Sequence, residues 1–334
     1  MLDQRLLPQQ TVYLDFTDFR QVAHAIRDMV VRGAPAIGAA AAWGLALVPY
    51  SSTTRVLDDA RRELEEAAKE MRLARPTAVN LSYAIERVLV RSKDPSINSL
   101  DELKNAVLDE ADAIALEDAL TNRKIAANAQ PLVPDPATII HHCNTGTLAT
   151  TDYGTALGVI RMAHELGKQV FCLVDETRPR LQGSRLTAWE LQQYGVPFKI
   201  IADGASGHFM RTLGVDLCIV GCDRVAANGD TANKIGTYNL AVLAHENRVP
   251  FYVACPTSTI DRHCASGEQI EIEERPAREI THIGEHPISP DGAEVGNPAF
   301  DVTPARYITA IITEKGIAYP PFEKSLSELF ALFT

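Results

Sequence analysis

The sequence predicts an α/β protein in which a mostly helical N-terminal domain precedes a Rossmann-like C-terminal domain with a parallel sheet. Three observations support this prediction. The first ~130 residues carry apolar residues at helical spacing, whereas the second half alternates strand-like apolar runs with helical stretches. Between these two patterns lie Pro131, Pro134 and Pro136, a cluster typical of a domain boundary. We therefore expect domains over residues 1–130 and 137–334.

Helix start signals recur in the N-terminal half. The segment Arg32-Gly33-Ala34-Pro35 precedes a predicted helix, and Pro35 suits its first turn because an N–H there has no intrahelical partner. Pro76 begins another predicted helix. Ser99-Leu100-Asp101-Glu102 is a capping box that begins a long acidic helix. The apolar stretch Ala34–Val48 is short for a membrane span and is expected to be a buried helix.

The C-terminal half predicts a parallel sheet covered on both faces, because its runs of Val, Ile and Leu are separated by helical stretches. Glycine follows two of these helical stretches, as expected at a helix end. The predicted strands are Thr138–His142, Val170–Val174, Phe198–Ala202, Leu217–Gly221 and Phe251–Ala254, with a further candidate in Tyr307–Thr313.

Charge and cysteine content limit the possible partners and compartment. The net charge of −11 over 334 residues argues against a nucleic-acid partner, so an anionic ligand needs a local cluster of positive groups. Cys172, Cys218 and Cys255 lie in apolar runs, where reduced cysteine behaves as a small hydrophobe, and we expect a reducing, cytoplasmic compartment. The N-terminus carries no secretory pattern, and no membrane association is expected.

Polar, small or charged residues follow five predicted strands. Ligands bind at the carboxyl ends of the strands in open parallel sheets, so these residues predict an active site at one sheet edge. They are Cys143-Asn144-Thr145-Gly146, the segment 175–183, Asp203-Gly204-Ala205, Asp223-Arg224 with the segment 228–234, and the segment 256–259.

Cys143 and Asp223 are the candidate catalytic residues at this edge. Cys143 follows a strand directly, and as a thiolate it could act as base or nucleophile if positive groups lower its pKa. The alternative is a small buried residue that fills the strand end. Asp223 could stay protonated in a dry cleft and donate a proton. Its alternatives are a helix cap or a salt bridge with Arg224. The residues alone leave both readings open.

Arg32, Arg75 and Lys234 are candidate phosphate ligands. Each lies just before a predicted helix, where unpaired N–H groups and the helix dipole favour an anion. The alternative for each is a solvated surface charge. The cysteine and histidine spacing forms no clean zinc pattern, and His141 and His142, adjacent on a strand, face opposite ways. No nucleotide-binding glycine motif follows a strand, so neither a metal nor a cofactor is predicted.

These same residues resemble a known family, methylthioribose-1-phosphate isomerase, over nearly the whole chain. The most specific stretches are the segments 25–38, Arg75-Pro76-Thr77-Ala78-Val79-Asn80-Leu81, Cys143-Asn144-Thr145-Gly146, the segment from Asp175 to Gly183, the segment from Asp223 to Thr237, and Asn297-Pro298-Ala299-Phe300-Asp301-Val302-Thr303-Pro304, whose role the sequence does not assign. The chain departs from the family at Thr151-Asp152, where Ala-Gly is common, and at Cys222, where alanine is common.

The resemblance implies a homodimer that isomerises 5-methylthioribose 1-phosphate to 5-methylthioribulose 1-phosphate in methionine salvage. It implies a small-molecule sugar phosphate as partner and no cofactor. Cys143 and Asp223 are then catalytic. The implied substrate contacts are Arg32, Gly33, Ala34, Arg75, Gln182, Asn233 and Lys234.

The substrate's own phosphate blocks its anomeric oxygen, so the sugar ring cannot open spontaneously. We expect protonated Asp223, kept protonated by an apolar lining, to donate a proton to the ring oxygen. Thiolate Cys143 would then act on the change at C2, through an enolate-like intermediate or a hydride shift. The alternative activities are isomerisation of 5-deoxyribose 1-phosphate or of ribose 1,5-bisphosphate. A further alternative is a non-catalytic regulatory protein that senses a sugar phosphate or nucleotide, which is expected to lack both catalytic residues.

Overall fold

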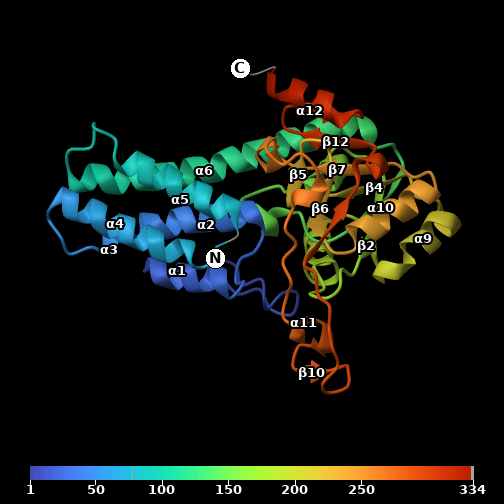
Figure 1. Ribbon diagram of the computed structural model, residues 1–334, viewed down its shortest axis with the longest axis horizontal. Helices are drawn as coiled ribbons and strands as arrows, with labels where there is room; N and C mark the ends of the chain where they lie inside the picture. The colour runs from blue at the N-terminus through green and yellow to red at the C-terminus, as the bar shows by residue number, and fades with distance from the viewer. Residues whose placement is uncertain (77, 332–334) are drawn as a thin grey trace. The chain divides into compact units, whose positions relative to one another are not determined.

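The computed structural model describes residues 1–76 and 78–331, so Thr77 in the motif that starts at Arg75 lies outside the described residues. The chain forms two compact units. The first consists of Met1–Leu120 and Thr147–Gly154, and the second of Thr121–Gly146 and the chain from Thr155 onwards. This division falls inside helix α6 (Leu100–Ala129), upstream of Pro131 (Figure 1). The domain limits 1–130 and 137–334 stay a prediction.

Helices dominate the first unit. They are α1 (Phe19–Arg27), α2 (Ala34–Ala46), α3 (Val48–Ser51), α4 (Leu57–Arg72), α5 (Val79–Ser92) and the first part of α6. Helix α2 is rich in alanine and glycine and packs against α1, α4 and α5. A Cβ atom on its Gly38 would lie 2.9 Å from the backbone oxygen of Asn80 in α5, so the small residues of α2 permit this close packing.

Two of the three predicted helix starts of this unit are confirmed, whereas α5 begins at Val79 because Pro76 lies in the preceding turn. Pro35 occupies the first turn of α2. At the start of α6, the Ser99 hydroxyl accepts a hydrogen bond from the Glu102 amide at 3.2 Å, and the Glu102 carboxylate accepts one from the Asn98 amide at 2.6 Å. Among the described residues, Ala34–Ser51 is long and apolar enough to cross a membrane, but 67% of this stretch is buried inside the protein, as in a core helix.

The α/β prediction is also confirmed. Within residues 78–331, the second unit holds a seven-stranded sheet in the order β13-β12-β7-β4-β1-β2-β3, parallel throughout except for the antiparallel pair β12–β13. Its strands are β1 (Ala137–His141), β2 (Val170–Asp175), β3 (Phe198–Ile201), β4 (Leu217–Val220), β7 (Phe251–Ala254), β12 (Ala310–Thr313) and β13 (Gly316–Ala318). The first five predicted strands lie within one residue of these bounds. The sixth starts later because Ala305–Tyr307 forms a 3₁₀ turn.

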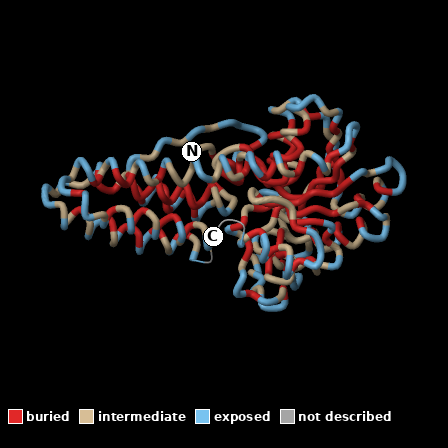
Figure 2. Tube along the Cα trace, turned by 90° about the horizontal axis from the view of Figure 1, so that it is seen from above, coloured by how far each residue is buried: buried red, intermediate tan, exposed pale blue. Residues whose placement is uncertain are grey.

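The central strands of the sheet are buried in the interior of the second unit, as their apolar runs predict, whereas the edge strand β3 is partly exposed (Figure 2). Helices α7 (Ala156–Glu165) and α10 (Thr237–Glu246) both pack on β4. A second, four-stranded sheet was not predicted. Its strands, in the order β11-β6-β5-β8, are β11 (Phe300–Thr303), β6 (Thr231–Lys234), β5 (Arg224–Ala226) and β8 (Ile260–Asp261). Each has four residues or fewer and includes polar side chains, so none forms a continuous apolar run like those of β4 and β7.

The strand order creates a switch point between β1 and β4. The chain runs from the central β1 outwards through β2 and β3, then returns to β4 and continues outwards through β7 and β12. The connections that leave the carboxyl ends of β1 and β4 therefore run in opposite directions, and such a switch point is the usual ligand position in open parallel sheets. Cys143 follows β1, and Asp223 follows β4.

Candidate active site

Cys143 is held in an unusual backbone conformation just after β1. Its φ of 69° lies in the left-handed region, which residues other than glycine seldom adopt. The Cys143 amide donates to the Thr177 hydroxyl at 2.9 Å, and the Cys143 carbonyl accepts from the Thr187 hydroxyl at 2.7 Å. Thr177 itself has a φ of 63°. Two neighbouring strained residues at a sheet edge are typical of a functional site, since such strain persists only where surrounding contacts impose it.

Gln182 lies in the loop after β2 and is buried. Its Oε1 atom has no hydrogen-bond partner in the described structure. A buried acceptor without a partner costs free energy, which a donor from a bound ligand can recover. The next residue, Gly183, packs so closely on Asp175 that a Cβ atom would lie 1.7 Å from the Asp175 carbonyl oxygen. This loop therefore has a fixed path that leaves one polar atom available.

Asn233 and Lys234 lie at the end of β6 rather than in a loop, and they precede α10 as expected. The buried Asn233 amide donates to the Thr237 hydroxyl at 2.9 Å. The Lys234 ammonium donates to the Ala299 carbonyl at 2.7 Å and lies 4.2 Å from the centre of the Phe300 ring. Lys234 is therefore oriented by the neighbouring strand β11 before any ligand binds.

Asp301 is a residue of this region that the sequence analysis left without a role. Its carboxylate accepts hydrogen bonds from the Gly236 amide at 2.8 Å and from the Tyr238 amide at 3.0 Å. These amides begin α10, so Asp301 takes the place that an external anion could occupy there. The Asn-Pro-Ala-Phe-Asp-Val-Thr-Pro segment thus caps α10 and supports Lys234. The expectation that the start of α10 offers free N–H groups is wrong for these two amides.

Asp223 lies between β4 and β5, and its amide donates to the Ala232 carbonyl at 2.9 Å. Its side chain is exposed, so the expected apolar lining that keeps it protonated is absent from this structure. The reason is its position on the short connection between two sheets, at the rim of both. The neighbouring Arg224 has an ion-pair contact with Asp261, 3.8 Å away.

Arg32, Gly33, Ala34 and Arg75 all belong to the helical unit, whereas the other predicted site residues belong to the second unit. Gly33 is the N-cap of α2 with a φ of 97°, and a Cβ atom there would lie 2.2 Å from the backbone oxygen of Ala149. This position therefore requires glycine. Arg75 lies in the turn before α5, and both Arg32 and Arg75 are half-buried.

Thr151, one of the departures from the family, ties the segment 147–154 to α6. Its amide and its hydroxyl both contact the Asp118 carboxylate at 2.8 Å, and the hydroxyl also lies 2.8 Å from the Ala115 carbonyl. The adjacent Asp152 carboxylate accepts a hydrogen bond from the Tyr153 amide at 2.7 Å. Local hydrogen bonding therefore accounts for both residues within the helical unit.

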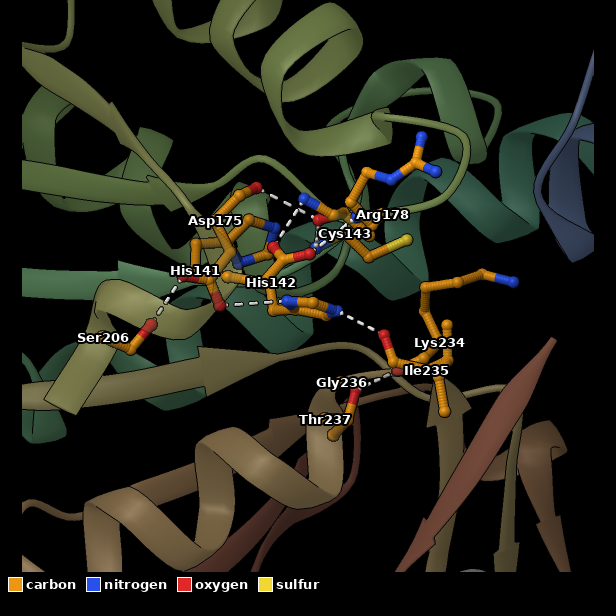
Figure 3. Close-up of polar contacts among 12 residues, drawn as sticks. His141, His142, Cys143, Asp175, Arg178, Ser206, Lys234, Ile235, Gly236 and Thr237 are labelled. Atoms are coloured by element: carbon orange, nitrogen blue, oxygen red, sulfur yellow. Dashed lines mark hydrogen bonds and ion pairs between the residues drawn. The ribbon is translucent and has the colours of Figure 1, made fainter. Parts of the chain in front are cut away.

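A buried acidic cluster lies behind Cys143. Potential ligand atoms of His142, Asp175 and Asp203 all lie within 4.8 Å of one another. Each residue is already engaged, because the His142 ring contacts Asp175 and the Asp203 carboxylate accepts from the amides of Thr177 and Arg178 at 2.7 Å (Figure 3). The cluster fits a hydrogen-bonded network better than a metal site, whose ligand atoms need lone pairs directed at the ion.

His141 is fully buried and is expected to make the second unit sensitive to acid. Burial lowers its pKa to about 4, because desolvation disfavours the imidazolium. Its Nδ1 donates to the Ile219 carbonyl at 2.8 Å, and its Nε2 accepts from the Thr145 hydroxyl at 3.3 Å, which is the neutral tautomer. The unfolded state therefore binds the extra proton first, and the stability that neutral His141 contributes is lost as pH falls from ~6.5 towards 4.

The measurement compares the free energy of unfolding of wild type and His141→Gln in urea between pH 7.5 and 4.5. The variant is expected to be less stable at pH 7.5, and this deficit should shrink by about 2 kcal/mol at pH 4.5 because glutamine does not titrate. A deficit that stays constant across this range would contradict a buried neutral His141.

The fold and the position of these residues define an α/β protein with a candidate ligand site at the carboxyl ends of its parallel strands. Residues 30–320 match the model of the Initiation factor 2 subunit family. A methylthioribose-1-phosphate isomerase from Synechococcus sp. is 56% identical over 98% of this chain and 94% of its own length. Methylthioribose-1-phosphate isomerase 2 from Pseudothermotoga lettingae is 54% identical over 99% of this chain and 95% of its own length.

Solved structures point to the same family as these sequence relatives. The crystal structure of 5-methylthioribose 1-phosphate isomerase from Pyrococcus horikoshii has a TM-score of 0.96 at 45% identity and covers 99% of this chain and 93% of that one. A structure from A. fulgidus described as translation initiation factor eIF-2B, subunit delta, has a TM-score of 0.93 at 40% identity, covering 99% and 96%. The chain belongs to the Initiation factor 2 subunit family and, within it, to the methylthioribose-1-phosphate isomerases.

Proposed function

We propose that this chain isomerises 5-methylthioribose 1-phosphate to 5-methylthioribulose 1-phosphate, a step of methionine salvage, without metal or cofactor. The observation that carries the proposal is Cys143, held in a left-handed conformation beside the switch point of the sheet, with Asp223 in the connection that follows the neighbouring strand β4. The family's named isomerases, 50–56% identical to this chain, support the same reaction.

The reaction moves hydrogen from C2 to C1 of the sugar. It requires the sugar ring to open, although the phosphate on the anomeric oxygen keeps the ring closed. Asp223, in its protonated form, donates a proton to the ring oxygen, and Cys143 as thiolate promotes the change at C2 by an enolate-like intermediate or a hydride shift. Since Asp223 is exposed in this structure, the bound substrate must supply its desolvation.

The substrate phosphate and hydroxyls are assigned to seven residues. Arg32, Arg75 and Lys234 supply positive charge, and the start of α2 at Gly33 and Ala34 supplies backbone N–H groups. Lys234 is supported by its position against Ala299 and Phe300. Asn233 and Gln182 supply polar side chains, and the partnerless Oε1 of Gln182 suits a sugar hydroxyl. Held together in this way, the substrate is oriented for attack.

The test is direct. Wild-type protein is incubated with methylthioribose 1-phosphate in the presence of a chelator, and the ketose is followed by ¹³C NMR of its carbonyl carbon. We expect conversion, with kcat/KM higher than for 5-deoxyribose 1-phosphate or ribose 1,5-bisphosphate at equal concentration. No conversion at high enzyme concentration would favour the regulatory reading, and faster turnover of either alternative sugar would reassign the substrate.

We further propose a cytoplasmic homodimer. None of the six cysteines forms a disulfide, and three of them lie in or directly after strands of the large sheet, as in a reducing compartment. Light scattering during size-exclusion chromatography should give twice the chain mass of 36.4 kDa. A mass equal to one chain at micromolar concentration would contradict the dimer.

A further inference from the structure

His142 is a fully buried histidine whose two ring nitrogens both have partners. Its Nδ1 lies 3.0 Å from Asp175 Oδ2, and its Nε2 lies 2.9 Å from the Ile235 carbonyl oxygen. A carbonyl only accepts, so Nε2 carries a proton and donates it. The remaining proton lies between Nδ1 and the carboxylate. One imidazole therefore joins the tip of β2 to the turn between β6 and α10 (Figure 3).

The two proposed functional side chains are covalent neighbours of this link. Cys143 follows His142 directly, and Lys234 directly precedes Ile235. In Figure 3, the Cys143 sulfur and the Lys234 amine both extend away from the side of the His142 ring on which Asp175 and Ser206 lie. The contact is close, because a Cβ atom on Gly236 would lie 2.8 Å from Cε1 of the His142 ring.

Asp175, the partner of His142 at the end of β2, is itself held by hydrogen bonds. Asp175 accepts a hydrogen bond from the Ser206 hydroxyl at 2.7 Å through its second oxygen, and its backbone carbonyl accepts from the Thr177 hydroxyl at 3.1 Å. That same Thr177 hydroxyl accepts from the Cys143 amide. Cys143 is thus connected to Asp175 by two routes, one through Thr177 and one through His142.

We propose that His142 is a positioning residue for the isomerisation, which sets the distance between Cys143 and Lys234 by clamping the Lys234–Gly236 turn to β1. This inference rests on the proposed function. Cys143 acts on the carbon skeleton and Lys234 holds the phosphate, so the spacing between them decides whether bound substrate meets the thiolate. A misplacement of about 1 Å can cost ~100-fold in rate.

A gain in folding stability alone is a weak explanation for the buried pair of His142 and Asp175. Burying a histidine and a carboxylate together costs desolvation that their attraction roughly repays, and apolar residues of similar volume often stabilise a core equally well. Unlike apolar contacts, hydrogen bonds are directional, so each ring nitrogen of His142 fixes the position of one partner. The geometry around His142 is therefore suited to fixing register between two segments 93 residues apart.

Four titratable groups interact with His142. Asp175 contacts it from β2, Asp203 acts from the turn after β3, Asp301 acts from β11, and the fourth group is the neutral His141, the last residue of β1. Burial disfavours the imidazolium, but the hydrogen bond and negative charge of Asp175, together with Asp203, outweigh it and raise the pKa of His142. The ring thus keeps its Nε2 proton, and the bond to Ile235, through the neutral range in either protonation state.

The test compares three variants at a temperature where circular dichroism shows each of them folded. In His142→Gln the side chain can reach only one of the two partners, so kcat/KM for methylthioribose 1-phosphate should fall ~100-fold, through both a lower kcat and a higher KM. In Asp175→Asn the amide can still donate to Nδ1 and accept from Ser206, so the clamp persists and the loss should stay within ~5-fold. The matched control is His141→Gln, because His141 is an equally buried neighbouring histidine whose ring contacts Ile219 instead of Ile235.

A second readout does not depend on activity. Hydrogen–deuterium exchange of peptides that cover Cys143 and Lys234–Gly236 should speed up together in His142→Gln, but not in His141→Gln or Asp175→Asn. Unchanged exchange at Lys234–Gly236, or a loss of kcat/KM in His142→Gln no greater than in His141→Gln, would overturn the positioning role. If wild type converts no substrate while the exchange result holds, the proposed function fails and the clamp itself stands.

Discussion

Cys143→Ser and Asp223→Asn are each expected to lower kcat for methylthioribose 1-phosphate by ~1,000-fold or more. A serine hydroxyl is not ionised near neutral pH, so it cannot replace a thiolate at the left-handed position after β1. Asparagine has no proton to transfer to the ring oxygen, and loss of a positioned general acid costs roughly 10²–10⁴-fold. The measurement is steady-state turnover, with KM determined in parallel to separate chemistry from binding.

Two matched variants control for general damage. Cys264→Ser makes the same chemical change at another buried cysteine, whose thiol donates to the Ser266 carbonyl at 3.2 Å, a bond that serine can keep. Asp216→Asn changes an acid at the opposite end of β4, where its Oδ2 accepts from the Thr138 amide and the amide oxygen can replace it. Both controls should retain wild-type turnover. If either Cys143→Ser or Asp223→Asn stayed within about twofold of wild type, the role of that residue would be wrong.

The double variant adds information about the order of events. If Asp223 opens the ring before Cys143 acts, the two substitutions block successive steps of one path. The double variant should then be little slower than the slower single variant, because the slower of two successive steps sets the overall rate. A fully multiplicative loss would indicate that both residues act independently on one rate-limiting transition state, which would contradict successive steps.

The large sheet could be predicted because each of its central strands is a continuous apolar run, which only burial on both faces explains. The placement of Cys143 and Asp223 at one edge then follows from strand direction alone. The strands β5, β6, β8 and β11 escaped prediction because their two to four residues include polar side chains and so form no continuous apolar run like β4 or β7.

The contacts of the site could not be derived in the same way. His142 and Asp175 lie 33 residues apart, and Asp301 lies 65 residues from Gly236, so only the sheet register brings these groups together. The left-handed conformation of Cys143 has no signal in the sequence, since the residue is not glycine. The exposure of Asp223 likewise depends on how two sheets join at their rims, which no local pattern records.

Gly183→Ala is the second substitution with a large expected effect. The added Cβ atom would lie 1.7 Å from the Asp175 carbonyl oxygen and 3.0 Å from the Thr177 hydroxyl oxygen. The first contact is with backbone and cannot be relieved by a side-chain rotation, so the loop that carries Gln182 must move away from β2. We expect about 3 kcal/mol or more of lost unfolding free energy, at the upper end of overpacking effects.

The same displacement should damage the site, because the Asp175 carbonyl holds the Thr177 hydroxyl that in turn binds the Cys143 amide. A kcat/KM loss of ~100-fold is therefore expected in the protein that remains folded. Gly204→Ala is the matched control, since a Cβ atom there meets nothing within 4 Å and stability should change by less than ~0.5 kcal/mol. The measurements are the free energy of unfolding in urea and the kcat/KM of both variants, each compared with wild type. A Gly183→Ala protein as stable and active as Gly204→Ala would mean that the loop after β2 is free to shift, and that the fixed path assigned to Gln182 and Cys143 is wrong.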